Sequence, residues 1–508
     1  MKPFSSSAAL VVFFLASTFI TNSSSAQVLY RLSDIGDLPG GDEWNWGGAI
    51  NDFGEVAGAS VTESGPTNEF TRVRPYHWSE STGITEIPAP LDSQYAYGTG
   101  INSDGLISIY SRSLRGRANR GWIWNPSVSE RVEIQPIVAG NSIDIESIND
   151  FGWVTGTESS IGYRWDPVNG IEHLSDLGRQ PTETRAINNV GQIAGSSVLL
   201  EGFQRAFILD PGSTQLQNIG IPPGNSSSSR AFGLNDLGDV VGYTRTPFGN
   251  NDTLYESFFW NETEGFTVLG QVPGIASGSS GAKGVNNRGF VTGWGGDYNV
   301  GWAGFVYSPY FGVQNLLDVV DSSGAGYDFI EAPDINEFGQ ILARGVDPDG
   351  NYSAMVLTPV TAGPESFVLA RGVVQGGSLY DITLSDDTDL TISRNRQDLQ
   401  PVIEFEVQSI VATPTPQTLT FTIESSVNSR GQVTQTIELF DYESGKYEQI
   451  DSRAASRFND SVVSIPVPGD ASRFVQAGLQ SVRARISYSA TRSSADYSAR
   501  VDRITWGF

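Results

Sequence analysis

A short pattern of apolar and polar positions recurs seven times in the first two thirds of the chain. Each copy has an aliphatic residue, Asn, two variable residues, Gly, one variable residue and a second aliphatic residue. A fixed period of roughly 40 to 50 residues is typical of repeat architectures. The copies begin at Ile50, Ile101, Ile148, Ile187, Leu234, Val285 and Ile335, and their asparagines lie 51, 47, 39, 47, 51 and 50 residues apart.

The pattern predicts a tight hairpin in every copy. Asn followed three residues later by Gly is the signature of a type I turn, because the Asn side chain bonds the backbone two residues on and Gly tolerates a positive φ. A Gly that follows the second strand, such as Gly156 or Gly242, predicts close approach of another backbone. The two flanking apolar runs therefore predict two antiparallel strands per copy.

Two further strands complete each unit. A third run alternates an aromatic and a large apolar residue, as in Tyr163 and Trp165, and a short fourth run follows, as in Ile171–Leu174. Both have the period of two that indicates strands. We expect the third-strand aromatics to pack between units rather than to bind sugars. Four strands in a unit of this length predict a propeller blade.

The two ends of the repeat region favour a ring over an open solenoid, the competing interpretation. The seventh copy lacks a fourth strand, and a linker follows Leu357. Leu32–Gly36 matches Leu174–Gly178 at four of five positions, so an unpartnered fourth strand lies near the N-terminus. A sheet edge left open exposes unpaired backbone groups. We therefore predict a seven-bladed β-propeller over residues 27–362, closed by this N-terminal strand.

These motifs resemble the HAF family of extracellular repeats. The Asn-x-x-Gly-x-aliphatic-x-Gly part matches well, whereas of the family's His-Ala-Phe tripeptide only Ala206-Phe207 is present. The resemblance implies secretion and a repeat scaffold. It carries over no catalytic residue.

Residues 363–508 lack the repeat and alternate polar and apolar positions in about eight runs. We predict strands at 366–369, 379–384, 402–407, 419–423, 434–440, 461–465, 481–487 and 497–506. Runs of short strands separated by Asp, Ser, Gly and Pro favour a β-sandwich of the jelly-roll kind. The whole chain is thus expected to be all-β.

Residues 1–26 resemble a secretory signal peptide. Lys2 precedes the apolar run Ala8–Ile20, and Ser24-Ser25-Ala26 provides small residues before a cleavage site. The run is too short for a membrane span. We expect an exported protein, extracellular or periplasmic, and a monomer with no membrane insertion.

Composition excludes several classes of chemistry. The chain has no Cys and two His, so thiolate metal sites and cysteine nucleophiles are excluded. Its net charge of −26 argues against nucleic-acid partners. Residues 27–362 carry 39 acidic and 17 basic residues, which suggests adaptation to a salty medium.

No catalytic, cofactor or metal residue is predicted. His77 and His173 lie on strands of different units, and no Gly-x-Ser-x-Gly elbow occurs. Two loops have oxygen ligands at calcium-like spacing. The first loop contains Asp347, Asp349 and Asn351, and we interpret it as a turn between strands. The second contains Asp386, Asp387 and Asp389 and lies in the predicted sandwich.

Two functions remain open from the sequence. The favoured one is a secreted non-enzymatic binding protein, with the propeller as scaffold and a sandwich that holds extracellular polysaccharide or a surface protein. The alternative is a polysaccharide hydrolase or lyase with paired carboxylates at the propeller axis.

Overall fold

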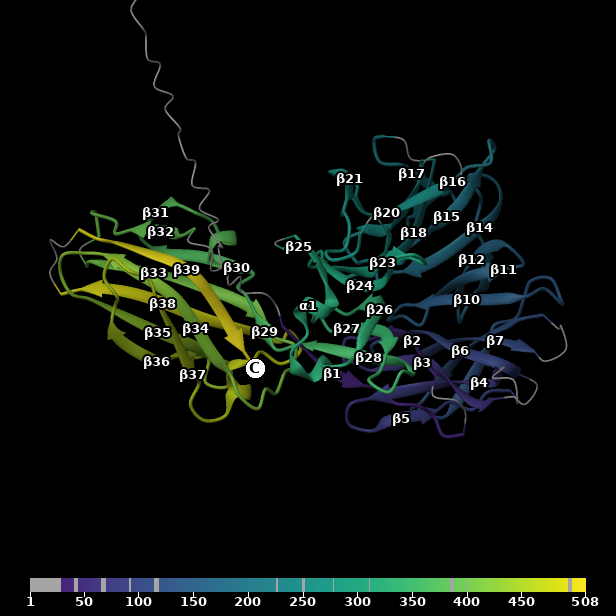
Figure 1. The fold of residues 1–508 in the computed structure, drawn as a ribbon, viewed down its shortest axis with the longest axis horizontal. Coiled ribbons are helices and arrows are strands. Elements are labelled where there is room, and N and C mark those ends of the chain that lie inside the picture. The colour runs from purple at the N-terminus through teal and green to yellow at the C-terminus, as the bar shows by residue number, and fades with distance from the viewer. Residues whose placement is uncertain are drawn as a thin grey trace, which may run out of the picture.

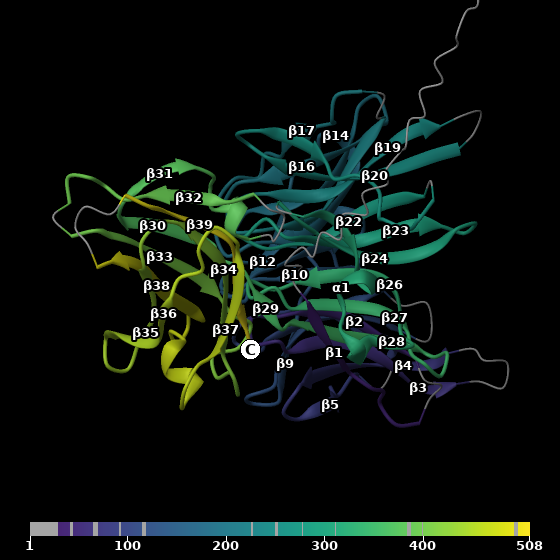
Figure 2. The same ribbon diagram turned by 60° about the vertical axis from the view of Figure 1, so that its left-hand side comes forward.

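The computed structural model describes residues 29–40, 44–64, 70–90, 93–113, 118–224, 227–248, 252–276, 278–309, 311–383, 388–398, 400–491 and 496–508. The predicted export segment, residues 1–26, lies outside these ranges. The described chain is almost entirely β-structure, arranged as two groups of sheets (Figures 1 and 2). Among the described residues, no helix is long and apolar enough to span a bilayer.

The first group consists of four-stranded antiparallel units, one for each sequence repeat. The innermost strands are β2 (Asn45–Ile50), β6 (Ser93–Ile101), β10 (Ile143–Ile148), β14 (Gly178–Ile187), β18 (Ser228–Leu234), β22 (Ser279–Val285) and β26 (Asp328–Ile335). The second strands are β3 (Val56–Ser64), β7 (Ile107–Ser113), β11 (Val154–Glu158), β15 (Ile193–Leu199), β19 (Val240–Phe248), β23 (Val291–Asp297) and β27 (Ile341–Val346).

The third and fourth strands form the outer half of each unit, on the side away from the innermost strand. The third strands are β4 (Phe70–Ser79), β8 (Arg120–Asn125), β12 (Ile161–Asp166), β16 (Gln204–Leu209), β20 (Asp252–Asn261), β24 (Gly301–Ser308) and β28 (Tyr352–Pro359). The fourth strands are β5 (Gly83–Glu86), β9 (Glu130–Glu133), β13 (Gly170–His173), β17 (Gln217–Gly220), β21 (Gly265–Val268) and β25 (Gly312–Asn315). A short helix, α1 (Leu316–Val319), and a 3-10 turn, η1 (Ser322–Gly324), follow β25.

The last unit takes its fourth strand from the N-terminal end of the described chain. Strand β1 (Tyr30–Asp34) pairs antiparallel with β28, from Tyr30 opposite Pro359 to Asp34 opposite Met355. The predicted pairing of this strand with the last repeat is therefore observed. No sheet of the described residues closes on itself, although a single bridge between Val73 and Tyr95 joins the first two units.

The third-strand aromatics form the core between units, as predicted. The side chain at this position is at most 1 % exposed in every unit, and each joins a cluster of buried apolar residues. These residues are Tyr76, Trp122, Tyr163, Phe207, Phe258 and Phe305, and Met355 takes the place of the aromatic residue in the last unit. The predicted close approach at the glycine of the second strand is also present, since a Cβ on Gly156 would lie 1.9 Å from the carbonyl oxygen of Asp144.

The second group of sheets comprises residues 361–507. One sheet contains β29 (Thr361–Ala362), β31 (Val373–Gly376), β32 (Leu390–Ser393), β34 (Thr420–Asn428), β37 (Ser461–Pro466) and β39 (Ser498–Gly507). The other contains β30 (Ser366–Arg371), β33 (Val402–Ile410), β35 (Val433–Asp441), β36 (Lys446–Ala454) and β38 (Ser481–Ala490). A 3-10 turn, η3 (Ala471–Phe474), precedes β38. Both sheets supply residues to one buried apolar cluster.

One predicted strand in this region is wrong. The segment predicted as a strand over 379–384 contains a 3-10 turn, η2 (Tyr380–Ile382), instead. The Asp381 carboxylate accepts a hydrogen bond from the Ser378 N–H and so stabilises the turn. Leu379 and Ile382, three residues apart, therefore face the same core, which their apolar pattern alone did not distinguish from a strand.

Candidate functional site

Every innermost strand is interrupted at the same place. The regular pairing with the second strand shifts three residues before the repeat Asn, as at Ile145/Ser147 and Ala282/Gly284. Such a β-bulge leaves one residue out of the ladder and redirects its side chain. The residues at this bulge position are Gly48, Thr99, Glu146, Arg185, Phe232, Lys283 and Pro333.

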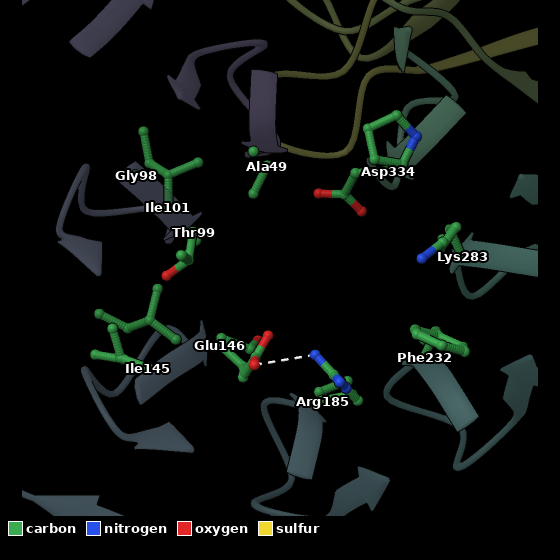
Figure 3. Close-up of a pocket in the computed structure, with 18 of the residues that line it drawn as sticks. Ala49, Gly98, Thr99, Ile101, Ile145, Glu146, Arg185, Phe232, Lys283 and Asp334 are labelled. Carbon is green, nitrogen blue, oxygen red and sulfur yellow. Dashed lines mark hydrogen bonds and ion pairs between the residues drawn. The ribbon is translucent and has the colours of Figure 1, made fainter. Parts of the chain in front are cut away.

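The bulges surround a cavity of about 590 Å³ that all seven innermost strands line. Figure 3 shows Thr99, Glu146, Arg185, Phe232 and Lys283 directed toward a common space. The residues next to the bulge are mostly small or aliphatic, so the bulge side chains define the chemistry of the walls. A volume of this size is within the range of small-molecule sites.

Three of the six charged side chains that line the cavity, Glu146, Arg185 and Arg344, are in ion pairs. Arg185 Nη1 lies 3.0 Å from Glu146 Oε1, and its Nη2 lies 3.2 Å from Glu183 Oε2. Arg344, on β27, pairs with Glu331 and lies 4.4 Å above the ring of Trp46. The Arg185–Glu146 pair and the contact of Arg344 with Trp46 join neighbouring units, whereas the Arg185–Glu183 and Arg344–Glu331 pairs each lie within one unit.

Aromatic side chains from the first two units form one side of the cavity. Trp46 and Tyr97 meet edge to face with ring centroids 5.9 Å apart, and Tyr97 stacks on Tyr110 at 6.2 Å. All three line the cavity, and Trp46 is 41 % exposed. Half-exposed aromatic faces beside polar groups are suited to a ligand with flat, partly apolar surfaces.

The repeat asparagines form a circuit of hydrogen bonds next to the cavity. In each unit the Asn Nδ2 donates to the carbonyl oxygen of the Asn in the next unit, at 2.8 to 3.0 Å. The circuit also joins the last repeat to the first, because Asn336 Nδ2 donates to Asn51 O at 2.9 Å. The asparagines also form the predicted turns, since Asn149 Oδ1 accepts from the N–H groups of Phe151 and Trp153.

Outside this circuit lies a polar mouth of about 200 Å³. The residue after the repeat Asn lines it in six of the seven repeats, and several of these side chains accept a backbone N–H from the neighbouring unit, as Asp52 accepts from Glu337 at 3.0 Å. The aliphatic residues that precede the asparagines, such as Ile101 and Ile148, line both this mouth and the larger cavity.

Burial and neighbouring groups raise the pKa values of several carboxyl groups around the two pockets. Burial raises the pKa of Asp334 to about 6, although the N–H groups of Ile50 and Ile335 that donate to it oppose the rise. Burial raises the pKa of Glu337 to about 7, and the nearby charges of Asp52 and Asp236 add to this. Burial also raises the pKa of Glu146, against the effect of Arg185.

The pKa of Glu337 gives a testable dependence of stability on pH. A carboxyl whose pKa is raised by folding binds a proton more readily in the folded state, so stability falls as pH rises from the ordinary Glu pKa of 4.5 to about 7 and levels off above that. Glu337→Gln should therefore raise the melting temperature at pH 8 and change it little at pH 5. Thermal unfolding from pH 5 to 8.5 checks this, and an equal shift at both ends would contradict it.

The two histidines do not lie at the axis. His173 Nε2 is 2.7 Å from Glu158 Oε2, whose carboxylate is fully buried and also accepts the N–H groups of Ile137 and Val138. His77 Nε2 is 3.6 Å from Glu55 Oε1. Within the described ranges, no group of three or more His, Asp or Glu side chains is arranged to hold a metal ion.

The first calcium-like loop is a turn, as the sequence favoured. Asp347 Oδ1 accepts the N–H groups of Asp349 and Asn351 at 2.9 and 2.8 Å, between β27 and β28. Of the second loop, Asp386 and Asp387 lie outside the described residues, and Asp389 Oδ2 is 3.5 Å from Arg500 Nη1.

Sequence reasoning missed the bulge residues. The signal was present in the repeat alignment, because the position three before Asn is occupied by seven different residue types while its neighbours are mostly small or aliphatic. Variation at one position of an otherwise regular repeat indicates a position that the scaffold does not fix.

The fold belongs to an all-β class whose solved structural neighbours are β-propeller proteins. The propeller domain of the Trilobed protease from Pyrococcus furiosus aligns with 65 % of this chain and 94 % of its own, at 10 % identity and a TM-score of 0.42. TolB from Acinetobacter baumannii aligns over 60 % and 64 %, at 13 % identity and a TM-score of 0.35. A puromycin hydrolase aligns over 72 % and 58 %, at 12 % identity and a TM-score of 0.42.

With identities of 10 to 13 % and TM-scores below 0.5, these similarities carry no conclusion about the ligand or the activity of this chain. No protein-family model matches the chain, and no curated protein matches it. The similarity to HAF repeats therefore stays a prediction from the motif.

Proposed function

We propose that the protein is a secreted, non-enzymatic binding protein that holds a carbohydrate in the axial cavity of a seven-bladed propeller. In this proposal residues 1–26 direct export, residues 27–362 form the propeller and residues 363–508 form an accessory β-sandwich. The observation that carries the proposal is the cavity itself, where one bulge from each repeat presents a different side chain to a shared space.

The lining supports a sugar ligand in particular. Trp46 and Tyr97 offer aromatic faces, and Thr99 offers a hydroxyl at the bulge position. Sugar rings combine apolar C–H faces with a rim of hydroxyl groups, so aromatic walls and a few polar groups complement them.

The main charged groups support binding over catalysis. The Glu146 carboxylate is engaged by Arg185, and Asp334 accepts two backbone N–H groups. One observation favours the alternative of a polysaccharide hydrolase or lyase: a carboxyl with a pKa of about 6, such as Asp334, is suited to donate a proton near neutral pH.

A glycan array followed by calorimetry tests the binding proposal. Trp46→Ala should weaken the best ligand about tenfold or more, because it removes the stacking face. Tyr298→Ala is the matched control, since Tyr298 is 96 % exposed and does not line the cavity. Equal affinity of both variants and the unmodified protein, or no glycan binding at all, would contradict the proposal.

An assay for new reducing ends distinguishes the two functions. The binding proposal expects no sugar release by the mature protein. Release that Asp334→Asn abolishes would establish the enzymatic alternative instead.

A further inference from the structure

Lysine is almost absent from this protein, and one of its few copies lies in the axial cavity. The chain contains three lysines, Lys2, Lys283 and Lys446, and residues 27–362 contain only Lys283. The same region uses 16 arginines for its other basic positions. Lys283 therefore stands out at the bulge of the sixth repeat, where its side chain is directed into the cavity (Figure 3).

The ammonium group of Lys283 lies beside an aromatic ring rather than a carboxylate. Its Nζ is 4.1 Å from the ring centroid of Phe232, the bulge residue of the preceding repeat. No carboxylate among the described residues lies within 4.0 Å of it. Burial lowers the pKa of Lys283, which reflects how much of its hydration it has lost.

The other cations at the cavity are already neutralised. Arg185 pairs with Glu146 and Glu183, and Arg344 pairs with Glu331. Lys283 is thus the cation of the lining that is left to meet a charge on a ligand. Residues 27–362 contain 39 acidic and 17 basic residues, so their overall electrostatic potential does not attract anions. An anionic ligand would therefore depend on a local cation such as Lys283.

The scaffold does not explain this lysine. The equivalent bulges carry Gly48, Thr99 and Pro333, so neither the bulge nor the packing around it requires a long side chain or a charge. An ammonium next to a ring in a partly dehydrated site does have favourable electrostatics. The ammonium group also favours an anionic ligand over a neutral one, because charge-assisted hydrogen bonds are stronger than neutral ones.

We infer that the axial cavity binds a uronate-containing oligosaccharide, with a carboxylate of the sugar on Lys283 and a pyranose face against the Trp46–Tyr97 wall. This inference rests on the proposed carbohydrate-binding function and adds the substrate class and the residue that selects it. Thr99 and Asp334 line the same cavity.

Calorimetry on matched ligand pairs tests the inference. The probes are uronate trisaccharides of several stereochemistries, each with its carboxyl-reduced, neutral counterpart. At least one uronate should bind more tightly than its reduced counterpart. Lys283→Gln should weaken that uronate about 10- to 100-fold, as expected for a lost charge-assisted contact, and change the neutral counterpart less than about twofold. Lys446→Gln is the matched control, because Lys446 is exposed in the second group of sheets.

A second measurement keeps the natural sequence and does not depend on the folding of a variant. Reductive methylation with ¹³C-formaldehyde labels the two lysines of the mature chain, and NMR follows each of them. The Lys283 signal should shift on addition of the uronate, whereas the Lys446 signal should stay in place.

The outcomes separate this inference from the proposed function. Equal affinity for uronates and their reduced counterparts, or tighter binding of a sulfated oligosaccharide, would overturn the uronate assignment while carbohydrate binding stands. An unmoved Lys283 signal in the presence of bound uronate would overturn it too. Failure of charged and neutral sugars alike would overturn both.

Discussion

Tyr30→Ala should lower the free energy of unfolding by about 3–5 kcal/mol, because it empties an aromatic position in a well-packed core. Tyr30 is 1 % exposed and packs in the cluster that also contains Phe329 and Met355. It belongs to β1, the strand that completes the last unit, so its loss also weakens the attachment of β1 to β28. Urea unfolding followed by tryptophan fluorescence measures the change.

Tyr30→Phe is the matched control for this experiment. It keeps the buried ring and removes only the hydroxyl, so it should cost much less than the alanine variant. Similar losses for both would show that ring burial is not the source of the effect. A loss below about 1 kcal/mol in Tyr30→Ala would contradict a role for β1 in holding the repeat region together.

Asn149→Ala should lower the free energy of unfolding by about 2–4 kcal/mol, since several buried polar groups lose their partners. The Asn149 side chain is 3 % exposed. It donates to Asn188 O and accepts the N–H groups of Phe151 and Trp153. The substitution thus breaks a turn and one link between units at the same time.

Asn218→Ala provides the comparison for the asparagine experiment. Asn218 is exposed and makes one local bond, from the Gly220 N–H. Its replacement should change stability by less than about 1 kcal/mol. If the two substitutions cost the same, the circuit of asparagines contributes nothing beyond its local turns.

The repeat architecture was predictable because its signals are local and occur many times. Asn and Gly at a fixed spacing specify a hairpin wherever they occur, and seven copies reinforce one another. The likeness of Leu32–Gly36 to Leu174–Gly178 was enough to predict the partner of β1. The region after residue 362 has no repeat to average over, so strands with weak alternation, such as β31 and β36, were missed.

The chemistry of the cavity was less predictable for a physical reason. The pairing of Glu146 with Arg185 joins residues 39 positions apart in different units, and only the packing of the units brings them together. The hydrogen bond from one repeat asparagine to the next could be inferred from the sequence only indirectly. The predicted turn uses the Asn oxygen only, which leaves a buried NH₂ group that requires an acceptor elsewhere.

The bulges also bear on how such proteins diversify. The hairpin turns, the asparagine circuit and the inter-unit aromatics form the framework, and of the seven bulge side chains only Glu146 and Arg185 add an ion pair between two units. Natural selection can therefore exchange the other five bulge residues one at a time with little effect on folding. A library confined to those five codons would sample new recognition properties on an unchanged scaffold.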